Sequence, residues 1–141
     1  MLSKNQARLF FLGGTVVFFL IFLVLSANSL SSGIPKQTHS ENITQAVVDG
    51  KIIFDENNCM GCHTILGEGA YYAPELTKVI DRRGEPFVRA VLGSKVPWTI
   101  SGRKMVAYDF NEKEINDLVE FFKWIGEMDL NGFPPEPDLK K

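Results

Sequence analysis

Residues 57–76 read NNCMGCHTILGEGAYYAPEL and hold both cysteines of the chain. Cys59, Cys62 and His63 form the pattern C-x-x-C-H, which is the attachment pattern of a c-type haem. Two thiols at this spacing can reach the two vinyl groups on one edge of a porphyrin, and the next residue then places an imidazole at the iron as an axial ligand. The stretch therefore predicts one covalently bound haem c.

Two other uses of a cysteine pair fit the chain less well. A zinc site needs further thiolate or imidazole ligands, and the chain has only two cysteines and two histidines. A redox-active dithiol is expected near a strand–helix junction, whereas here a helical pattern precedes the pair and glycines follow it. If both thiols are bonded to haem, no disulfide is expected.

An uncharged apolar run, LFFLGGTVVFFLIFLVLSA, occupies residues 9–27. Its 19 residues are enough to cross a bilayer as one helix. The alternative is a cleaved signal peptide, whose apolar core is usually about 7 to 15 residues long and ends at a small-x-small cleavage site. The LSANS sequence at the end of the run fits such a site poorly. We therefore expect residues 1–30 to be a retained membrane anchor.

The charges beside the anchor predict its orientation. Lys4 and Arg8 precede the apolar run without an acidic residue, and such positive flanks stay in the cytoplasm. We expect a single-pass protein of a bacterial inner (cytoplasmic) membrane, with the N-terminus in the cytoplasm and the haem domain in the periplasm. Residues 28–141 carry the other 13 Lys and Arg against 17 Asp and Glu, a net charge of −4, which argues against nucleic acid as a partner.

The chain after the anchor begins with a polar segment. Residues 31–40 contain Gly and Pro, which predicts a linker, and residues 41–141 form the expected haem domain. Ser40 is predicted as the N-cap of a first helix. A glycine inside a helix costs about 1 kcal/mol relative to alanine, so we expect a close helix crossing at Gly50.

The remaining periodicity is helical. Pro86 predicts the start of a short helix that ends near Gly93, and Asn111 with Glu114 predicts a capped start of the terminal helix. That helix carries apolar residues at helical spacing, namely Ile115, Leu118, Val119, Phe122 and Ile125. The predicted fold class is all-α, with one N-terminal transmembrane helix followed by a class I monohaem cytochrome c domain.

A six-coordinate haem needs a second axial ligand, and Met105 is the predicted one. It lies 42 residues after His63, in a predicted loop with enough chain between them to wrap the haem. Met60 lies between the haem cysteines and cannot reach the opposite face. Met1 lies beyond the membrane run, and Met128 follows the terminal helix.

Two alternatives to Met105 stay open, namely His39 and an open coordination position. A thioether ligand raises the reduction potential of the haem and closes the iron to small molecules. With Met105 as ligand, the chain is expected to carry single electrons without catalysing a reaction itself.

Residues 59–76, CMGCHTILGEGAYYAPEL, resemble the signature of the cytochrome c subunit (the C subunit) of bacterial nitric oxide reductase. The resemblance extends over nearly the whole chain. It includes the anchor, AVVDGKIIFDENNC in the first helix, EFFKWI in the terminal helix and the DLNGFPP tail. The sequence departs from the family where many members have Met-Pro at the distal ligand, because Val106 follows Met105 here.

The resemblance implies a role in denitrification or nitric oxide detoxification. A soluble donor such as a small cytochrome c or a cupredoxin would reduce the haem. The electron would pass to a polytopic catalytic subunit with haem b, haem b3 and non-haem iron, where two NO become N2O and water. One alternative is a generic membrane-anchored cytochrome c that delivers electrons to another terminal oxidase, and another is a haem sensor with a labile sixth position.

The resemblance also suggests a purpose for the GEGAYY run at residues 67–72. In the family, the positions of Gly69 (backbone oxygen) and Tyr71 (phenol) help to hold calcium at the interface with the catalytic subunit, and Glu68 would support the loop. Oxygen ligands suit calcium. The alternative is that the glycines shape an ordinary loop around the haem edge, with the tyrosines packed on the ring or bonded to a propionate.

Overall fold

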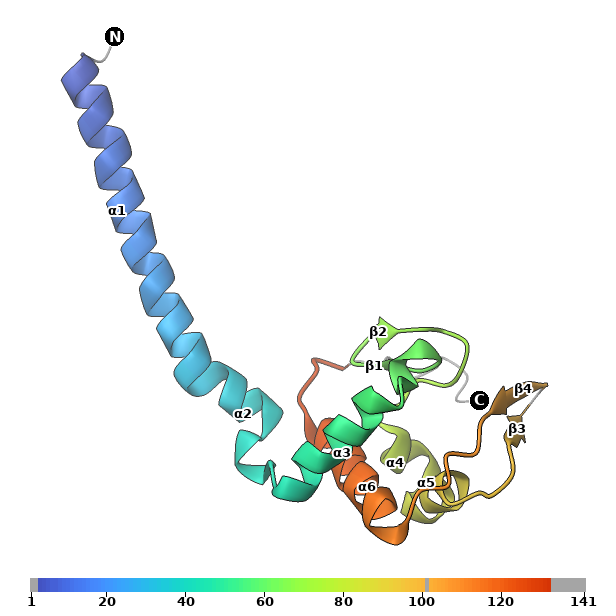
Figure 1. Cartoon of the computed structure of the whole chain (residues 1–141). Coiled ribbons are helices and arrows are strands. Elements are labelled where there is room, and N and C mark those ends of the chain that lie inside the picture. Colours follow the sequence, from blue (N-terminus) through green and yellow to red (C-terminus); the bar gives the residue numbers. More distant parts are fainter. Residues whose placement is uncertain (1–2, 101, 133–141) are drawn as a thin grey trace, which may run out of the picture. The chain divides into compact units, whose positions relative to one another are not determined.

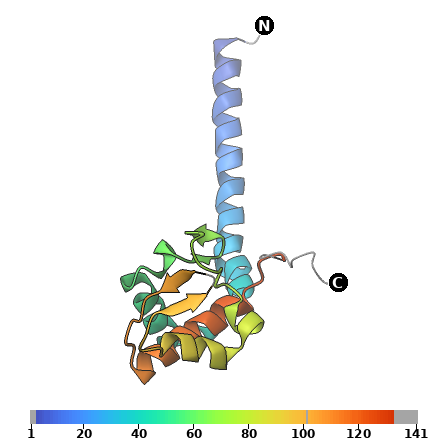
Figure 2. The same cartoon turned by 90° about the vertical axis from the view of Figure 1, so that its right-hand side faces the viewer.

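The structure is a computed structural model that describes residues 3–100 and 102–132. The chain divides into two units, Met1–Gln37 and Thr38–Lys141, and Figures 1 and 2 show the elements of each. The first unit is helical, whereas the second combines helices with two short antiparallel hairpins. This arrangement confirms the predicted fold class. The hairpins have strands of two or three residues, too short to show an alternating sequence pattern.

Helix α1, Lys4–Asn28, makes up most of the first unit. Ser3 and Gln6 form a capping box at its start, which satisfies two of the free N–H groups there. The helical stretch Lys4–Thr38 has a mean hydropathy of 2.7 in its most apolar window, and no residue of that window is buried. It is long and apolar enough to cross a membrane.

The segment predicted as a linker, residues 31–40, is helical as far as Thr38. A π-helical turn, Ser29–Gly33, leads into α2, Ile34–Thr38. Such a turn pairs residues five apart, and the N–H of Ile34 donates to the Ser29 carbonyl. The altered pairing fits Pro35, which has no N–H to donate. The polar composition of this segment therefore does not interrupt the helix.

Helix α3, Gln45–Glu56, begins later than the sequence predicts. Its N-cap is Thr44, whose side chain accepts a hydrogen bond from the N–H of Val47. Ser40 starts a separate 3-10 turn, Ser40–Asn42, so the predicted N-cap at Ser40 was wrong. Ile43 has an extended backbone that separates the turn from the helix.

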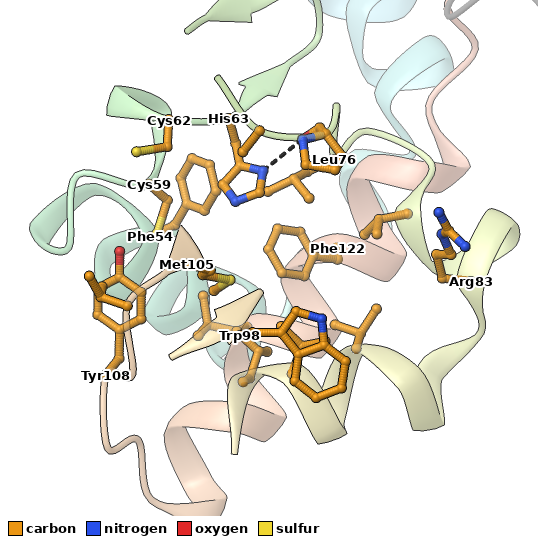
Figure 3. Close-up of a pocket in the computed structure, with 18 of the residues that line it drawn as sticks. Phe54, Cys59, Cys62, His63, Leu76, Arg83, Trp98, Met105, Tyr108 and Phe122 are labelled. Atoms are coloured by element: carbon orange, nitrogen blue, oxygen red, sulfur yellow. Dashed lines mark hydrogen bonds between the residues drawn. The ribbon is translucent and has the colours of Figure 1, made fainter. Parts of the chain in front are cut away.

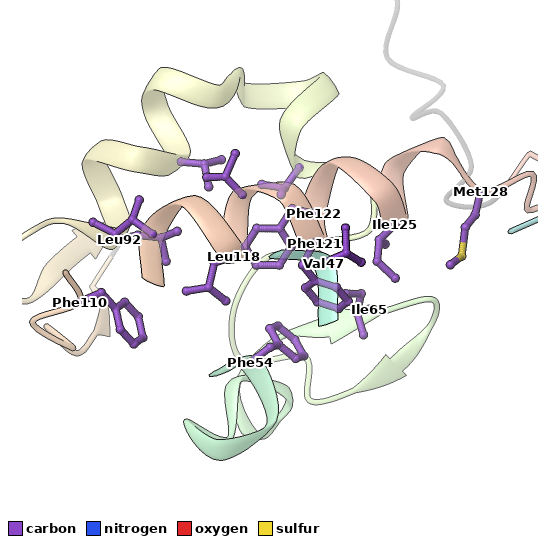
Figure 4. Packing of buried hydrophobic residues seen from close by; sticks show 14 residues of the cluster. Val47, Phe54, Ile65, Leu92, Phe110, Leu118, Phe121, Phe122, Ile125 and Met128 are labelled. Carbon is purple, nitrogen blue, oxygen red and sulfur yellow. The ribbon is translucent and has the colours of Figure 1, made fainter. Parts of the chain in front are cut away.

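Helices α3 and α6 pack closely and carry the core of the second unit. Helix α6, Glu112–Glu127, starts with the predicted Asn111–Glu114 capping box. A Cβ atom at Gly50 would collide with the carbonyl oxygen of Asp117 and lie 2.9 Å from the Cβ of Phe121. The predicted close crossing at Gly50 is thus confirmed. Figure 4 shows the apolar side chains packed along α6.

The remaining elements surround this helix pair. They are the 3-10 turn Cys59–Gly61, the hairpin of β1 (Thr64–Ile65) and β2 (Glu68–Gly69), α4 (Val79–Arg83), α5 (Glu85–Leu92), and the hairpin of β3 (Trp98–Ile100) and β4 (Arg103–Met105). Pro86 lies in the first turn of α5, and Gly93 is its C-cap, as predicted. Helices α4 and α5 both contact α6.

Candidate haem site

The cysteine motif forms a compact turn directly after α3. Asn58 has a left-handed backbone, φ 49°, which turns the chain at the end of the helix. The N–H groups of Cys62 and His63 both donate to the Cys59 carbonyl, at 3.2 and 2.9 Å. This turn brings Cys59, Cys62 and His63 to the wall of one cavity, as Figure 3 shows.

The cavity has a volume of about 710 Å³, within the range of roughly 300–1,000 Å³ for ligand pockets. Most of its wall is apolar. The apolar lining comes from α3, the loop after His63, α4, α5 and α6, with Phe54, Leu76, Val79, Phe87, Val88, Val91, Leu92, Leu118 and Phe122. A cavity of this size and character suits a large, flat apolar group.

The imidazole of His63 is oriented by the backbone. Its Nδ1 lies 2.6 Å from the carbonyl oxygen of Pro74, drawn as a dashed line in Figure 3. A hydrogen bond from Nδ1–H to this carbonyl leaves Nε2 free to bind a metal. Burial lowers the pKa of His63, partly offset by the bond to Pro74. Burial thus favours the neutral imidazole, the form that ligates iron, and the hydrogen bond fixes the orientation of its ring.

The loop after His63 folds back onto the cysteine motif. Gly69 has φ +115°, and a Cβ atom there would collide with the His63 carbonyl oxygen. The N–H of Ala70 donates to the carbonyls of Met60 and His63 at 3.0 and 3.2 Å, and the N–H of Ala73 donates to Cys62 at 2.8 Å. The glycine is therefore required for the close approach of this loop to the haem-binding turn.

Met105 lies at the end of strand β4, opposite Trp98 on β3. It lines the same cavity as His63, so the structure brings together the four residues predicted to bind haem. The sequence predicts a loop here, whereas the structure has a hairpin. The alternative ligand His39 is not among the residues of the cavity wall; its carbonyl accepts a hydrogen bond from Trp124 Nε1 at 3.3 Å.

Comparisons with known proteins identify the family of the chain. The family model for cytochrome c matches residues 47–126. The chain is 39% identical to the C subunit of nitric oxide reductase from Stutzerimonas stutzeri over 141 residues, 96% of either chain. It is 41% identical to the same subunit from Halomonas halodenitrificans, again over 96% of either chain, and 37% identical to that of Paracoccus denitrificans over 95%. The chain belongs to the family of nitric oxide reductase C subunits.

Membership of this family includes a cytochrome c domain, and with it a covalently bound haem c. The chemistry of the thiols agrees. Burial raises the pKa of Cys59 to about 11, with smaller contributions from Asp55 and Cys62. A redox-active dithiol needs a lowered thiol pKa, so the raised pKa of Cys59 argues against a redox pair.

Polar groups in the cavity wall also fit a haem. The indole Nε1 of Trp98 is buried and lacks a hydrogen-bond partner among the described residues. A buried donor without a partner is costly, and a haem carboxylate would supply the acceptor. Arg82 and Arg83 line the same cavity and suit the negative charge of such carboxylates. These residues were not predicted, because neither a buried indole N–H nor its neighbours can be recognised from a linear pattern.

The structure does not assemble a metal site around Gly69 and Tyr71. Tyr71 is 81% exposed, and Glu68 is exposed on β2, paired with Ile65 on β1. In the part of the chain that the structure describes, no three His, Cys, Asp or Glu residues are grouped so as to hold a metal ion. The predicted calcium ligands therefore lie on the surface of this chain without a cluster of acidic ligands around them.

Proposed function

We propose that this chain is the membrane-anchored electron-transfer subunit of a nitric oxide reductase. It accepts electrons from a periplasmic donor and passes them to a catalytic subunit that reduces NO to N2O. The observation that carries the proposal is the likeness to nitric oxide reductase C subunits over 95–96% of this chain and of its relatives. That likeness includes the apolar helix as well as the haem domain.

The haem supplies a one-electron redox centre when it is bound. Cys59 and Cys62 would hold it through thioether bonds, and His63 and Met105 would be the axial ligands. The hydrogen bond from His63 to Pro74 supports this assignment, as does the place of Met105 in the cavity wall. A thioether ligand raises the potential and leaves no open position, so the bond-making chemistry belongs to the partner.

The proposed partners are a polytopic subunit with haem b, haem b3 and non-haem iron, and a soluble donor such as a small cytochrome c or a cupredoxin. The test is to purify the complex through a tag on this chain and to analyse its metals and haems. Haem b and non-haem iron beside haem c support the proposal. Copper without non-haem iron would instead favour another terminal oxidase, and a CO-binding haem c would favour a sensor.

We further propose that α1 is retained as a single-pass anchor of the bacterial inner membrane, with the N-terminus in the cytoplasm and the haem domain in the periplasm. Lys4 and Arg8 before the apolar run support this orientation. The intact mass of the haem-loaded chain should include residues 1–27. A mass that lacks about the first thirty residues would identify a cleaved signal peptide.

Finally, we propose that Gly69 and Tyr71 contribute oxygen ligands to a calcium ion at the interface with the catalytic subunit. The exposure of Tyr71 supports this, since its phenol is free to reach a partner. Tyr71→Phe removes only the oxygen, so it should make complex stability or NO turnover sensitive to chelator while the haem c spectrum stays normal. If NO turnover and complex stability in the presence of chelator were unchanged in the variant, the loop would instead have the alternative role of packing around the haem.

A further inference from the structure

The hairpin that carries Met105 is small and has few supports. It consists of β3 and β4, each of three residues, and a two-stranded hairpin is marginally stable by itself in water. Arg103 and Lys104 are exposed, and Val106, which follows Met105, is 58% exposed. Something beyond the strand pairing is needed to hold Met105 at the cavity.

On each strand of the hairpin, one side chain contacts a neighbouring segment besides the packing of Met105 against the core. On β3, the ring of Trp98 packs edge-to-face on Phe87 of α5, with centroids 5.9 Å apart. On β4, Arg103 contacts Tyr72, which lies in the loop after the haem motif, 31 residues earlier. The second contact joins the two ligand-bearing segments of the cavity directly.

The contact between Tyr72 and Arg103 has two parts. The Nη1 of Arg103 donates to the backbone carbonyl of Tyr72 at 2.5 Å, and its guanidinium carbon lies 5.5 Å from the centroid of the Tyr72 ring. The planar guanidinium is suited to both interactions at once, which lysine is not. The N–H of Lys104 also lies 3.5 Å from the Tyr72 hydroxyl, at the outer limit of a hydrogen bond.

Tyr72 is itself fixed to the haem-binding turn. The next residue, Ala73, donates its N–H to the Cys62 carbonyl at 2.8 Å. The residue after that, Pro74, provides the carbonyl that orients His63. Tyr72 is thus held by the same short loop that positions the first axial ligand.

We propose that Tyr72 and Arg103 are positioning residues that latch the β3–β4 hairpin to the loop after His63 and thereby hold Met105 at the iron. The inference rests on the proposed ligation by Met105. It also assigns a purpose to the second tyrosine of the GEGAYY run. Without the contact between Arg103 and Tyr72, the hairpin would hold Met105 less firmly, and an added ligand would compete with Met105 more effectively.

The test uses the haem-loaded full chain in detergent, with imidazole as the competing ligand for the oxidised haem. Arg103→Ala should bind imidazole about tenfold more tightly than the unaltered chain. That factor corresponds to about 1.4 kcal/mol, which is less than a hydrogen bond from a charged group and an exposed cation–π contact can contribute together. The weak sulfur-to-iron band at the red end of the spectrum should be reduced in parallel.

Matched variants separate the latch from simple charge removal. Lys104→Ala removes the same charge from the next residue and should leave imidazole affinity unchanged. Tyr72→Phe keeps the ring and the carbonyl and should behave like the unaltered chain, whereas Tyr72→Ala should weaken Met105 ligation. Arg103→Lys should fall between the unaltered chain and Arg103→Ala, and it serves as the test if Arg103→Ala does not load haem.

The proposed role of Arg103 would be wrong if Arg103→Ala and the unaltered chain bound imidazole equally tightly. It would also be wrong if Arg103→Ala and Lys104→Ala changed the imidazole affinity by the same factor. If Met105 is not a ligand at all, the unaltered chain itself should lack the sulfur-to-iron band. The two failures are therefore distinguishable in the same set of spectra.

Discussion

The two segments that carry the proposed haem ligands are built in different ways. The proximal segment, residues 59–76, is held by backbone hydrogen bonds to itself, such as Ala73 to Cys62 and Leu76 to Thr64. The distal hairpin, residues 98–105, is held to its surroundings by side chains, with Trp98 on Phe87 and Arg103 on Tyr72. The first is a local construction, and the second depends on residues far away in the sequence.

This difference bears on how firmly each axial ligand is held. Backbone hydrogen bonds form with almost any side chain, so shortening one exposed side chain of the proximal loop should leave its backbone hydrogen bonds in place. The distal hairpin loses one of its supporting contacts when the side chain of Trp98 or of Arg103 is shortened. We therefore expect the bond to Met105 to be the weaker one, and the predictions below test this contrast.

The largest effect is expected on the proximal side. Replacing both thiols, Cys59→Ala with Cys62→Ala, should abolish covalent haem and leave the large apolar cavity open to water, which destabilises the domain. Haem staining after denaturing electrophoresis and intact mass measure the loss. The single variants are the controls, since each retains one thioether. Covalent haem in the double variant would contradict the assignment of the motif.

Removing the distal ligand should change the spectrum and the potential but not haem attachment. Met105→Ala should abolish the sulfur-to-iron band and lower the reduction potential, by a sizeable part of the roughly 0.8 V range that axial ligands span. Optical spectra and a redox titration measure both. His39→Ala is the control and should leave both unchanged. A band that survives in Met105→Ala would mean that another residue is the ligand.

A change at the crossing of α3 and α6 should lower the stability of the whole haem domain. Gly50→Ala places a methyl group against the Asp117 carbonyl and Phe121, which should cost about 1–3 kcal/mol of stability. Chemical denaturation of the haem-loaded chain measures the loss. Gly126→Ala on α6 is the control, because a Cβ atom there makes only ordinary contacts, the nearest at 3.5 Å from the Thr77 carbonyl oxygen. Equal stabilities of the two variants would contradict a tight crossing at Gly50.

A smaller effect is expected from the indole N–H on the distal side. Trp98→Phe keeps a ring beside Phe87 but removes the donor that would serve a haem carboxylate. A carboxylate that loses a hydrogen bond has a raised pKa. The pH range over which the reduction potential changes should therefore move to higher pH than in the unaltered chain. Redox titrations at several pH values would measure this. The control is Phe87→Leu, which alters the ring contact but keeps the indole N–H. If the reduction potential varied with pH identically in all three chains, a hydrogen bond from Trp98 to a haem carboxylate would be contradicted.

The smallest effect concerns the helices behind the distal hairpin. Hydrogen bonds from Lys123 and then Arg89 hold the pKa of Glu85 below its ordinary value. A lowered folded pKa means that this stabilisation is complete above the unfolded pKa and is lost as the pH falls through the folded pKa. Glu85→Gln should therefore flatten the acid side of the stability curve slightly, measured by thermal unfolding from pH 7 downward. Glu56→Gln, an exposed carboxyl on α3, is the control, and an equal flattening there would contradict a specific role for Glu85.

Several elements were predictable because their signals are local. The haem motif, the apolar run of residues 9–27, the Asn111 cap and the α5 boundaries at Pro86 and Gly93 all follow from adjacent residues. The start of α3 could not be predicted in this way, because Ser40 and Thr44 are equally good N-cap residues in the sequence. The extended backbone at Ile43 decides between them. The helical path of residues 31–38 was missed because a π turn accommodates Pro35 where composition predicts an interruption.

The sequence by itself determined the C-x-x-C-H motif that predicts haem c attachment through Cys59, Cys62 and His63, and the apolar run that precedes the haem domain. Spacing within a few residues fixes that chemistry. Only the tertiary structure decided which groups surround the cavity: the indole of Trp98, whose Nε1 has no partner among the described residues, and the contact of Arg103 with Tyr72. These groups meet through the packing of the folded chain across 31 residues of sequence, and no periodic or adjacent pattern encodes that meeting.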